Sequence, residues 1–263
     1  MRVFLAGLLL ALLTMTSVLA FDEEVAAHPE IDRGKTAPTS SPIIVFGFLG
    51  GYVRPDNMLH VEVQLAARLQ SEYAPNAYAE VFENHREIEA HTKILRLLDA
   101  DHSGSLSDEE KRRARIILYG HSWGGSETIE LARQLEQDSI PVLLTIQVDS
   151  ITKRKEDDGL IPANVAEAVN FYQPDSVLHG RAEIRAVDPQ RTRILGNFRL
   201  DYKSSPISCS DDYPWLVRHF AKPHAEIECD PNVWDRVEAL IRAQLPPLRS
   251  AAPVTLRTES SGQ

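Results

Sequence analysis

Residues 115–128 read RIILYGHSWGGSET, and this stretch decides the fold. An apolar run from Arg115 to Tyr119 precedes a G-x-S-x-G motif centred on Ser122, and a helical pattern follows it. A serine between a strand and a helix, with glycines two residues before and after it, is typical of a nucleophile elbow. The glycines let the chain turn sharply where a Cβ would clash. The motif therefore predicts a serine hydroxyl above a sheet edge, at a helix N-terminus that favours a developing oxyanion.

Short apolar runs alternate with amphipathic segments on both sides of this motif. The pattern predicts strands at residues 43–46, 77–82, 115–119, 142–148, 182–186 and 192–200. It predicts helices at residues 59–73, 85–98, 124–137, 164–172 and 231–245. Strands that alternate with helices predict an α/β fold, in which helices cover both faces of a mostly parallel sheet. Such a sheet carries its reactive loops at the carboxyl ends of the strands.

The two ends of the chain differ from this pattern. Residues 1–20 are typical of a signal peptide, because Arg2 precedes a short apolar run that ends at a cleavage site after Ala20. We therefore expect a secreted or periplasmic protein without a stable membrane anchor after cleavage. Residues 21–41 are predicted to be a linker and 246–263 a disordered tail, which leaves 42–245 as the folded domain.

Composition narrows the classes of function. The chain has 263 residues, of which 43% are hydrophobic, and a formal net charge of −10. A chain this acidic, without a basic run, is a poor candidate for binding nucleic acid or anionic membranes. In an exported protein, the pair Cys209 and Cys229 predicts one disulfide. Two unpaired buried thiols are the alternative, and the sequence leaves the oligomeric state open.

Residues 99–110 read DADHSGSLSDEE and match the calcium-binding loop of an EF-hand. The ligand positions 1, 3, 5, 7 and 12 are occupied by Asp99, Asp101, Ser103, Ser105 and Glu110. Gly104 stands at position 6, where the loop needs a sharp turn. The pattern predicts one structural Ca²⁺ ion, bound weakly because serines replace carboxylates, and no organic cofactor. The alternative is an acidic loop that caps the next helix through Ser107 and Glu110.

The elbow resembles that of the α/β-hydrolase superfamily, in particular its secreted lipase- and esterase-like serine hydrolases, and the resemblance covers residues 43–245. A second stretch, VFGFLG at residues 45–50, resembles the VHGFLG stretch that follows an early strand in bacterial lipases. Phe46 stands where those lipases usually carry His. The resemblance implies that the backbone N–H groups of Phe48 and Trp123 form an oxyanion hole.

The resemblance also implies a catalytic triad in the chain order serine, acid, histidine. Ser122 is then the nucleophile. His224 is the favoured base, because it lies between the last predicted strand and the final predicted helix, which we expect to be a loop. Asp149, at the end of the strand 142–148, is the favoured acid. The alternatives are His179 and His219 for the base, and Asp188 and Asp201 for the acid.

These residues imply an exported serine hydrolase that cleaves a small-molecule or lipid carboxylic ester by acyl transfer. Thioesterase and amidase activities are open alternatives, because a triad does not choose the leaving group. The alternative from another class is a non-catalytic, exported calcium-binding module on a hydrolase scaffold. An intact serine, acid and base in the right order favours the enzyme.

Overall fold

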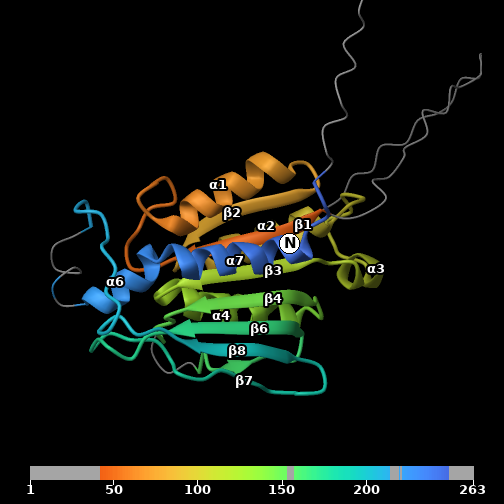
Figure 1. Ribbon diagram of the computed structural model, residues 1–263. Coiled ribbons are helices and arrows are strands. Elements are labelled where there is room, and N and C mark those ends of the chain that lie inside the picture. The colour runs from red at the N-terminus through yellow and green to blue at the C-terminus, as the bar shows by residue number, and fades with distance from the viewer. Residues whose placement is uncertain (1–41, 153–156, 214–218, 220, 249–263) are drawn as a thin grey trace, which may run out of the picture. The chain divides into compact units, whose positions relative to one another are not determined.

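The structure is a computed structural model, and it describes residues 42–152, 157–213, 219 and 221–248 (Figure 1). All of these residues belong to one compact unit. The predicted signal peptide, the predicted linker and residues 249–263 of the predicted tail lie outside the described residues. Among the helices of the described ranges, none combines the length and the apolarity needed to cross a membrane.

A parallel sheet of six strands forms the centre of the fold, in the order β2-β1-β3-β4-β6-β8 (Figure 1). Its strands are β1 (Ile43–Leu49), β2 (Ala77–Glu83), β3 (Ile116–His121), β4 (Val142–Val148), β6 (Val165–Tyr172) and β8 (Arg193–Arg199). A separate parallel pair is formed by β5 (Leu160–Ile161) and β7 (Arg185–Ala186). The predicted α/β class with a mostly parallel sheet is confirmed.

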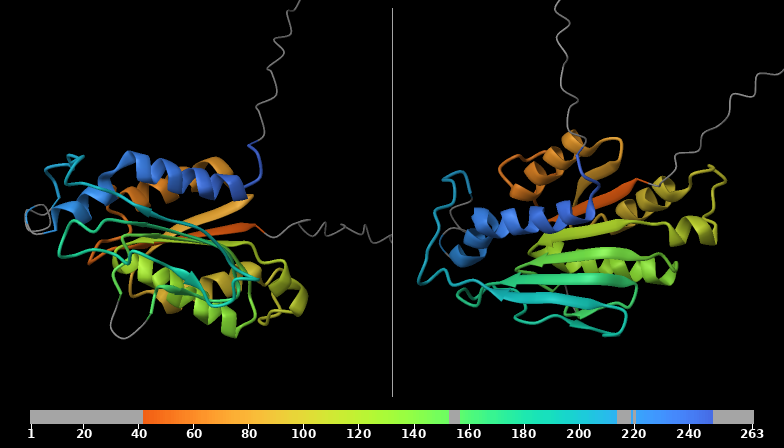
Figure 2. Two further views of the ribbon diagram at one scale, coloured as in Figure 1. Left: turned by 60° about the horizontal axis from the view of Figure 1, so that its bottom comes forward. Right: turned by 45° about the vertical axis from the view of Figure 1, so that its right-hand side comes forward.

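Helices cover both faces of this sheet (Figure 2). One face carries α1 (Val61–Tyr73) and α7 (Pro231–Gln244), and the other carries α2 (Glu87–Leu98) and α4 (Trp123–Gln137). Two short helices, α3 (Asp108–Arg112) and α6 (Lys222–Cys229), lie in connections. The predicted helices at 59–73, 85–98, 124–137 and 231–245 are thereby confirmed.

The two helical layers explain the apolar sequence of β1. Successive side chains of a strand point to opposite faces of the sheet. Ile43 and Val45 pack into the core beneath α1 and α7, whereas Ile44 and Phe46 pack into the core above α2 and α4. Because both faces are covered, the strand has no polar side and reads as a continuous apolar run.

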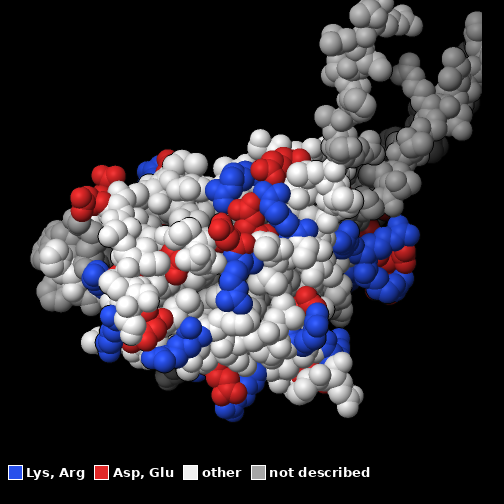
Figure 3. Space-filling view, in the orientation of Figure 1, with Lys and Arg blue, Asp and Glu red and all other residues white. Residues whose placement is uncertain are grey.

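Charged side chains on the outer surface of α1 and α7 are paired. Arg68 of α1 contacts Glu238 of α7 at 2.6 Å, and Arg242 of α7 contacts Glu72 of α1 at 2.7 Å. On the face drawn in Figure 3, basic and acidic side chains are interspersed. Exposed pairs of this kind contribute at most about 1 kcal/mol each, so the apolar contacts beneath them dominate the packing.

The helix predicted at residues 164–172 is wrong, because this segment forms β6. It lies between β4 and β8 and is hydrogen-bonded to both. Val165, Ala168, Val169 and Phe171 are all fully buried. A strand buried on both faces does not alternate, so its periodicity cannot be distinguished from that of a short buried helix. The strand predicted at 182–186 is also shorter than expected, since only the two residues of β7 pair there.

The strand order creates a crevice at the carboxyl edge of the sheet. From β1 the chain winds to β2 at one edge, then returns across β1 to β3 and continues toward β8. The connections after β1 and β3 therefore run to opposite sides, and ligands bind at such a switch point in open α/β sheets. Gly50 follows β1 and Ser122 follows β3, so both residues lie at this point.

Candidate active site

Ser122 occupies the turn between β3 and α4 in a conformation that is unusual for a residue with a side chain. Its φ is 57° and its ψ is −126°. Such backbone conformations cost on the order of 1–3 kcal/mol and persist only where the surroundings enforce them. Here the Ser122 N–H donates to the Val148 carbonyl at 3.0 Å, and the Ser122 carbonyl accepts from the Ile151 N–H at 3.0 Å. Strand β4 and the residues after it thus hold the elbow.

The two outer glycines of the motif are required by close backbone contacts. A Cβ on Gly120 would lie 2.4 Å from the Gly124 carbonyl group. A Cβ on Gly124 would lie 2.0 Å from the carbonyl oxygen of Phe48. The elbow therefore packs directly against the end of β1, and no larger residue fits at either position.

The structure brings Ser122, His224 and Asp149 together. The Nε2 of His224 lies 2.9 Å from the Ser122 Oγ, and its Nδ1 lies 2.6 Å from Asp149 Oδ2. Asp149 is fully buried, and the other two are more than nine-tenths buried. The expected loop around His224 is wrong, because this residue lies on α6. Pro223 suits the first turn of that helix, where its missing N–H costs nothing.

The alternative residues lie elsewhere. His179 and His219 are exposed. Asp188 accepts a hydrogen bond from the Gln190 N–H at 2.9 Å, and Asp201 accepts one from the Ser204 N–H at 3.0 Å, so both carboxylates stabilise local turns.

Asp149 is held by two groups that the sequence did not reveal. Its Oδ1 accepts hydrogen bonds from the backbone N–H groups of Gly180 and Gln173, at 2.6 and 3.2 Å. Its Oδ2 accepts one from the Gln173 side chain at 2.8 Å. A Cβ on Gly180 would lie 2.5 Å from the Asp149 carbonyl carbon, so the close approach requires a glycine. These donors compensate a buried carboxylate and fix its orientation toward His224.

Helix α6, which carries His224, is also held covalently. Cys229 at its end forms a disulfide with Cys209, with a Cα–Cα distance of 5.5 Å. The predicted disulfide is therefore present. A bridge across 20 residues stabilises by roughly 3 kcal/mol in the chain-entropy model. It joins the histidine-bearing helix to the segment that follows β8.

The residues predicted to form the oxyanion hole lie on two sides of Ser122. Trp123 is the first residue of α4, a position whose N–H has no intrahelical acceptor. Phe48 is fully buried in β1, and its ring packs 6.0 Å from that of Phe82. Its role stays a prediction. In the same segment, Gly50 lies beside the serine, because a Cβ on Gly50 would be 3.0 Å from the Cβ of Ser122.

A cleft of about 850 Å³ opens above these residues. Ser122 and His224 line it, and its volume suits a small organic molecule. The ring of Tyr52 meets that of Trp123 edge to face, with the centroids 5.8 Å apart. The apolar and aromatic side chains of the walls are those of Tyr52, Val53, Leu59, Trp123, Leu178, Tyr213 and Ala221.

His121, directly before the serine, belongs to a second buried group of ionisable side chains. Its ring lies 4.6 Å from the ring of His224. Burial, and then repulsion by His224, lowers the pKa of His121 to about 4. Burial, and then the neighbouring Glu228, raises the pKa of Glu62 well above its ordinary value. His121 is thus neutral around pH 7, and only His224 among these two rings is placed to accept the serine proton.

The predicted calcium ligands are partly gathered in the loop before α3. Carboxylate oxygens of Asp99, Asp101 and Glu110 lie within 4.8 Å of one another. The alternative helix-capping arrangement is also present, since Ser107 and Glu110 form a reciprocal capping box. This loop precedes β3, whereas Ser122 follows it, so the loop lies at the opposite edge of the sheet from the cleft (Figure 1).

Comparisons with known proteins give likenesses in structure alone. No family model matches the chain, and no curated protein matches its sequence. An acetylxylan esterase structure is 12% identical with a TM-score of 0.37, covering 79% of this chain and 100% of its own. ClbQ from the colibactin pathway is 10% identical with a TM-score of 0.37, covering 78% and 98%. The RedJ thioesterase from Streptomyces coelicolor is 11% identical with a TM-score of 0.34, covering 82% and 98%.

The contacts of Asp149 predict the effect of Gln173→Leu. This change removes a donor from a buried carboxylate, so the free energy of unfolding should fall by about 2–3 kcal/mol. Urea denaturation measures the difference. The matched control is Gln190→Leu, at an exposed position, which should change the same quantity by less than about 0.5 kcal/mol. Equal stability of the two variants would show that Gln173 does not support Asp149.

Proposed function

We propose that this protein is an exported serine hydrolase that cleaves carboxylic esters. The observation that carries the proposal is the continuous set of hydrogen bonds from Ser122 through His224 to Asp149, which opens onto the cleft. A serine hydroxyl is a poor nucleophile unless a base takes its proton. The base here is itself oriented by a buried acid, which is the arrangement that activates a serine.

In this mechanism the Ser122 Oγ attacks the ester carbonyl while its proton passes to His224 Nε2. Asp149 holds the Nδ1–H of His224, which fixes the tautomer and stabilises the imidazolium. The tetrahedral oxyanion is stabilised by backbone N–H groups, one from Trp123 and one from the end of β1, where Phe48 is the predicted donor. His224 then protonates the leaving alcohol, and a water molecule hydrolyses the acyl-enzyme by the same steps.

The cleft supports a substrate with an apolar part. Most of its lining surface is apolar, and polar or charged side chains such as Arg54, Asp56 and Asp212 line it as well. Pockets of this kind hold a small molecule by apolar contact and orient it with a few polar groups. The proposed substrate is therefore a small-molecule or lipid ester. The hydrogen bonds that join Ser122, His224 and Asp149 favour an esterase over a non-catalytic scaffold.

Export is supported by two features of the chain. The first twenty residues have the pattern of a signal peptide. The disulfide between Cys209 and Cys229 is of a kind that persists in oxidising compartments outside the cytosol.

We also propose that the loop 99–110 binds one structural Ca²⁺ ion. The loop is already folded around its acidic side chains, since Asp99 accepts hydrogen bonds from the N–H groups of Ser103 and Gly104 at 3.0 and 2.9 Å. Gly104 has a φ of 82°, as the sharp turn of such a loop requires. The loop precedes β3 and the cleft lies at the other end of that strand, so the ion would have a structural role and would not take part in the reaction.

Substitutions at the three residues test the hydrolase. Ser122→Ala and His224→Ala should each lower kcat for 4-nitrophenyl acetate by about 10⁴-fold or more, since nucleophile and base act as a unit. Asp149→Asn should lower it by about 10⁴-fold because the histidine tautomer is then wrong. The matched controls are His219→Ala and Asp201→Asn, which should retain wild-type rates. Unchanged activity in Ser122→Ala would remove the hydrolase proposal.

The calcium proposal is tested by Glu110→Gln, because glutamine can still complete the capping box but loses the ligand charge. Wild-type protein should gain about 2.7 kcal/mol when free calcium exceeds its dissociation constant a hundredfold, with a matching rise in Tm. The variant should show no rise, at an unchanged kcat. If calorimetry detects no calcium binding to the wild type at millimolar concentrations, the calcium proposal is wrong and the loop serves only to cap α3.

A further inference from the structure

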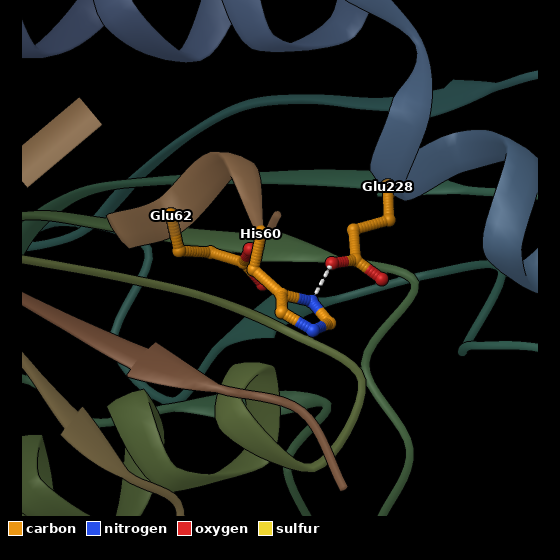
Figure 4. A group of neighbouring side chains, drawn as sticks. All are labelled: His60, Glu62 and Glu228. Atoms are coloured by element: carbon orange, nitrogen blue, oxygen red, sulfur yellow. Dashed lines mark hydrogen bonds and ion pairs between the residues drawn. The ribbon is translucent and has the colours of Figure 1, made fainter. Parts of the chain in front are cut away.

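Four ionisable side chains are buried together beside Ser122, and the proposed hydrolysis uses none of them. They are His60, Glu62, His121 and Glu228, which are 8%, 1%, 4% and 6% exposed. His60 and Glu62 come from the start of α1, Glu228 comes from the end of α6, and His121 ends β3. Figure 4 shows that the side chains of His60, Glu62 and Glu228 extend toward one another from these two helices.

Some of the separations within this cluster suit ligands around a shared ion, although His60 Nδ1 also contacts Glu228 Oε1 directly. One ligand atom from each of His60, Glu62 and Glu228 lies within 4.8 Å of the others. The Nδ1 of His121 lies 3.6 Å from Glu228 Oε2 and 3.8 Å from Glu62 Oε1. These separations are too long for hydrogen bonds. Two ligands bound to one ion at about 2.0–2.2 Å, at the tetrahedral angle, are separated by about 3.3–3.6 Å.

His60 Nδ1 is hydrogen-bonded to Glu228 Oε1 (Figure 4), and the other acceptors of the cluster face one another. Within the described ranges, Glu62 Oε2 has no hydrogen-bond partner although it is fully buried. The Nε2 of His121 lies 3.2 Å from the His224 carbonyl, which can only accept, so this nitrogen carries the proton. In a neutral imidazole the Nδ1 is then an acceptor, and it faces two carboxylates. Facing acceptors away from water are unfavourable unless a cation or protons lie between them.

We propose that His60, Glu62 and Glu228, with His121 facing them, bind one divalent transition-metal ion of the zinc class. Imidazole and carboxylate together suit Zn²⁺ and its neighbours. The loop 99–110 offers oxygen ligands alone, which suit Ca²⁺. The chain thus has two sites of different chemistry, one buried at the cleft and one exposed at the opposite edge of the sheet.

The ion connects the start of α1 to the helix that carries the proposed base. Glu228 and His224 are four residues apart on α6 and therefore lie on the same face of that helix. A metal bound to Glu228 fixes this face from the α1 side, while the disulfide at Cys229 fixes the end of the helix. The ion is a structural support for α6, and its binding does not depend on whether the site hydrolyses esters.

Zinc titration of chelator-treated wild-type protein tests the proposal. Calorimetry and elemental analysis after gel filtration should give one Zn²⁺ per chain, and cobalt in its place should give visible d–d absorption from nitrogen and oxygen ligands. Ser122→Ala should bind zinc as the wild type does. If the wild-type protein retains no stoichiometric zinc and shows no cobalt absorption, the cluster is neutralised by protons and the proposal is wrong.

The discriminating variant is Glu62→Gln, because glutamine has the shape of a protonated glutamate but is a poor metal ligand. If Glu62 binds the ion, this variant should bind zinc at least a hundredfold more weakly than the wild type. Its circular dichroism spectrum should be unchanged. The matched control is Glu110→Gln in the calcium loop, which should bind zinc normally. Equal zinc affinity in Glu62→Gln and wild type would overturn the assignment of the ligands.

Discussion

The left-handed backbone of Ser122 is the constraint on which the site depends. A residue with a side chain adopts a φ near 57° only where its surroundings enforce it. Here β4 and the residues after it enforce it through hydrogen bonds to the N–H and the carbonyl of Ser122. Gly120 and Gly124 allow the turn because a Cβ on either would overlap a carbonyl group. The strained turn directs the Oγ away from the sheet and toward His224. The remaining elements can be understood as supports for this one conformation.

The parallel sheet supplies these supports from a single edge. Ser122 follows β3, Asp149 follows β4 and Gln173 follows β6, so adjacent strands carry the proposed nucleophile, the proposed acid and the residue that holds that acid. The proposed base, His224, lies outside the sheet on α6. That helix needs its own attachments, which are the disulfide at Cys229 and the buried contacts of Glu228. Because His224 lies on α6, this short helix has to be held in a fixed position relative to the sheet.

Sequence patterns predict those features of the site that depend on residues close together in the chain. The elbow is visible because glycine spacing, an apolar strand and a helical pattern coincide within residues 115–137. Gln173 is not predicted as a site residue because the pattern of residues 164–172 indicates a helix, whereas the strand β6 places the next residue at the carboxyl edge of the sheet. The cluster around Glu62 and Glu228 was not predictable, since its members are separated by up to 168 residues and meet only through tertiary packing. The sequence does not indicate the helical setting of His224, because a proline such as Pro223 suits a loop as well as the first turn of a helix.

Covalent labelling with a fluorophosphonate measures the reactivity of Ser122 itself, because such probes react only with an activated serine. Trypsin releases Ser122 in the peptide 116–133, and fragmentation distinguishes it from Ser126. We expect one phosphonyl group on Ser122 in the wild type and in His219→Ala, and strongly slowed labelling in His224→Ala. A wild-type protein that remains unlabelled, or that carries the label on another serine, would contradict the claim that His224 and Asp149 activate Ser122.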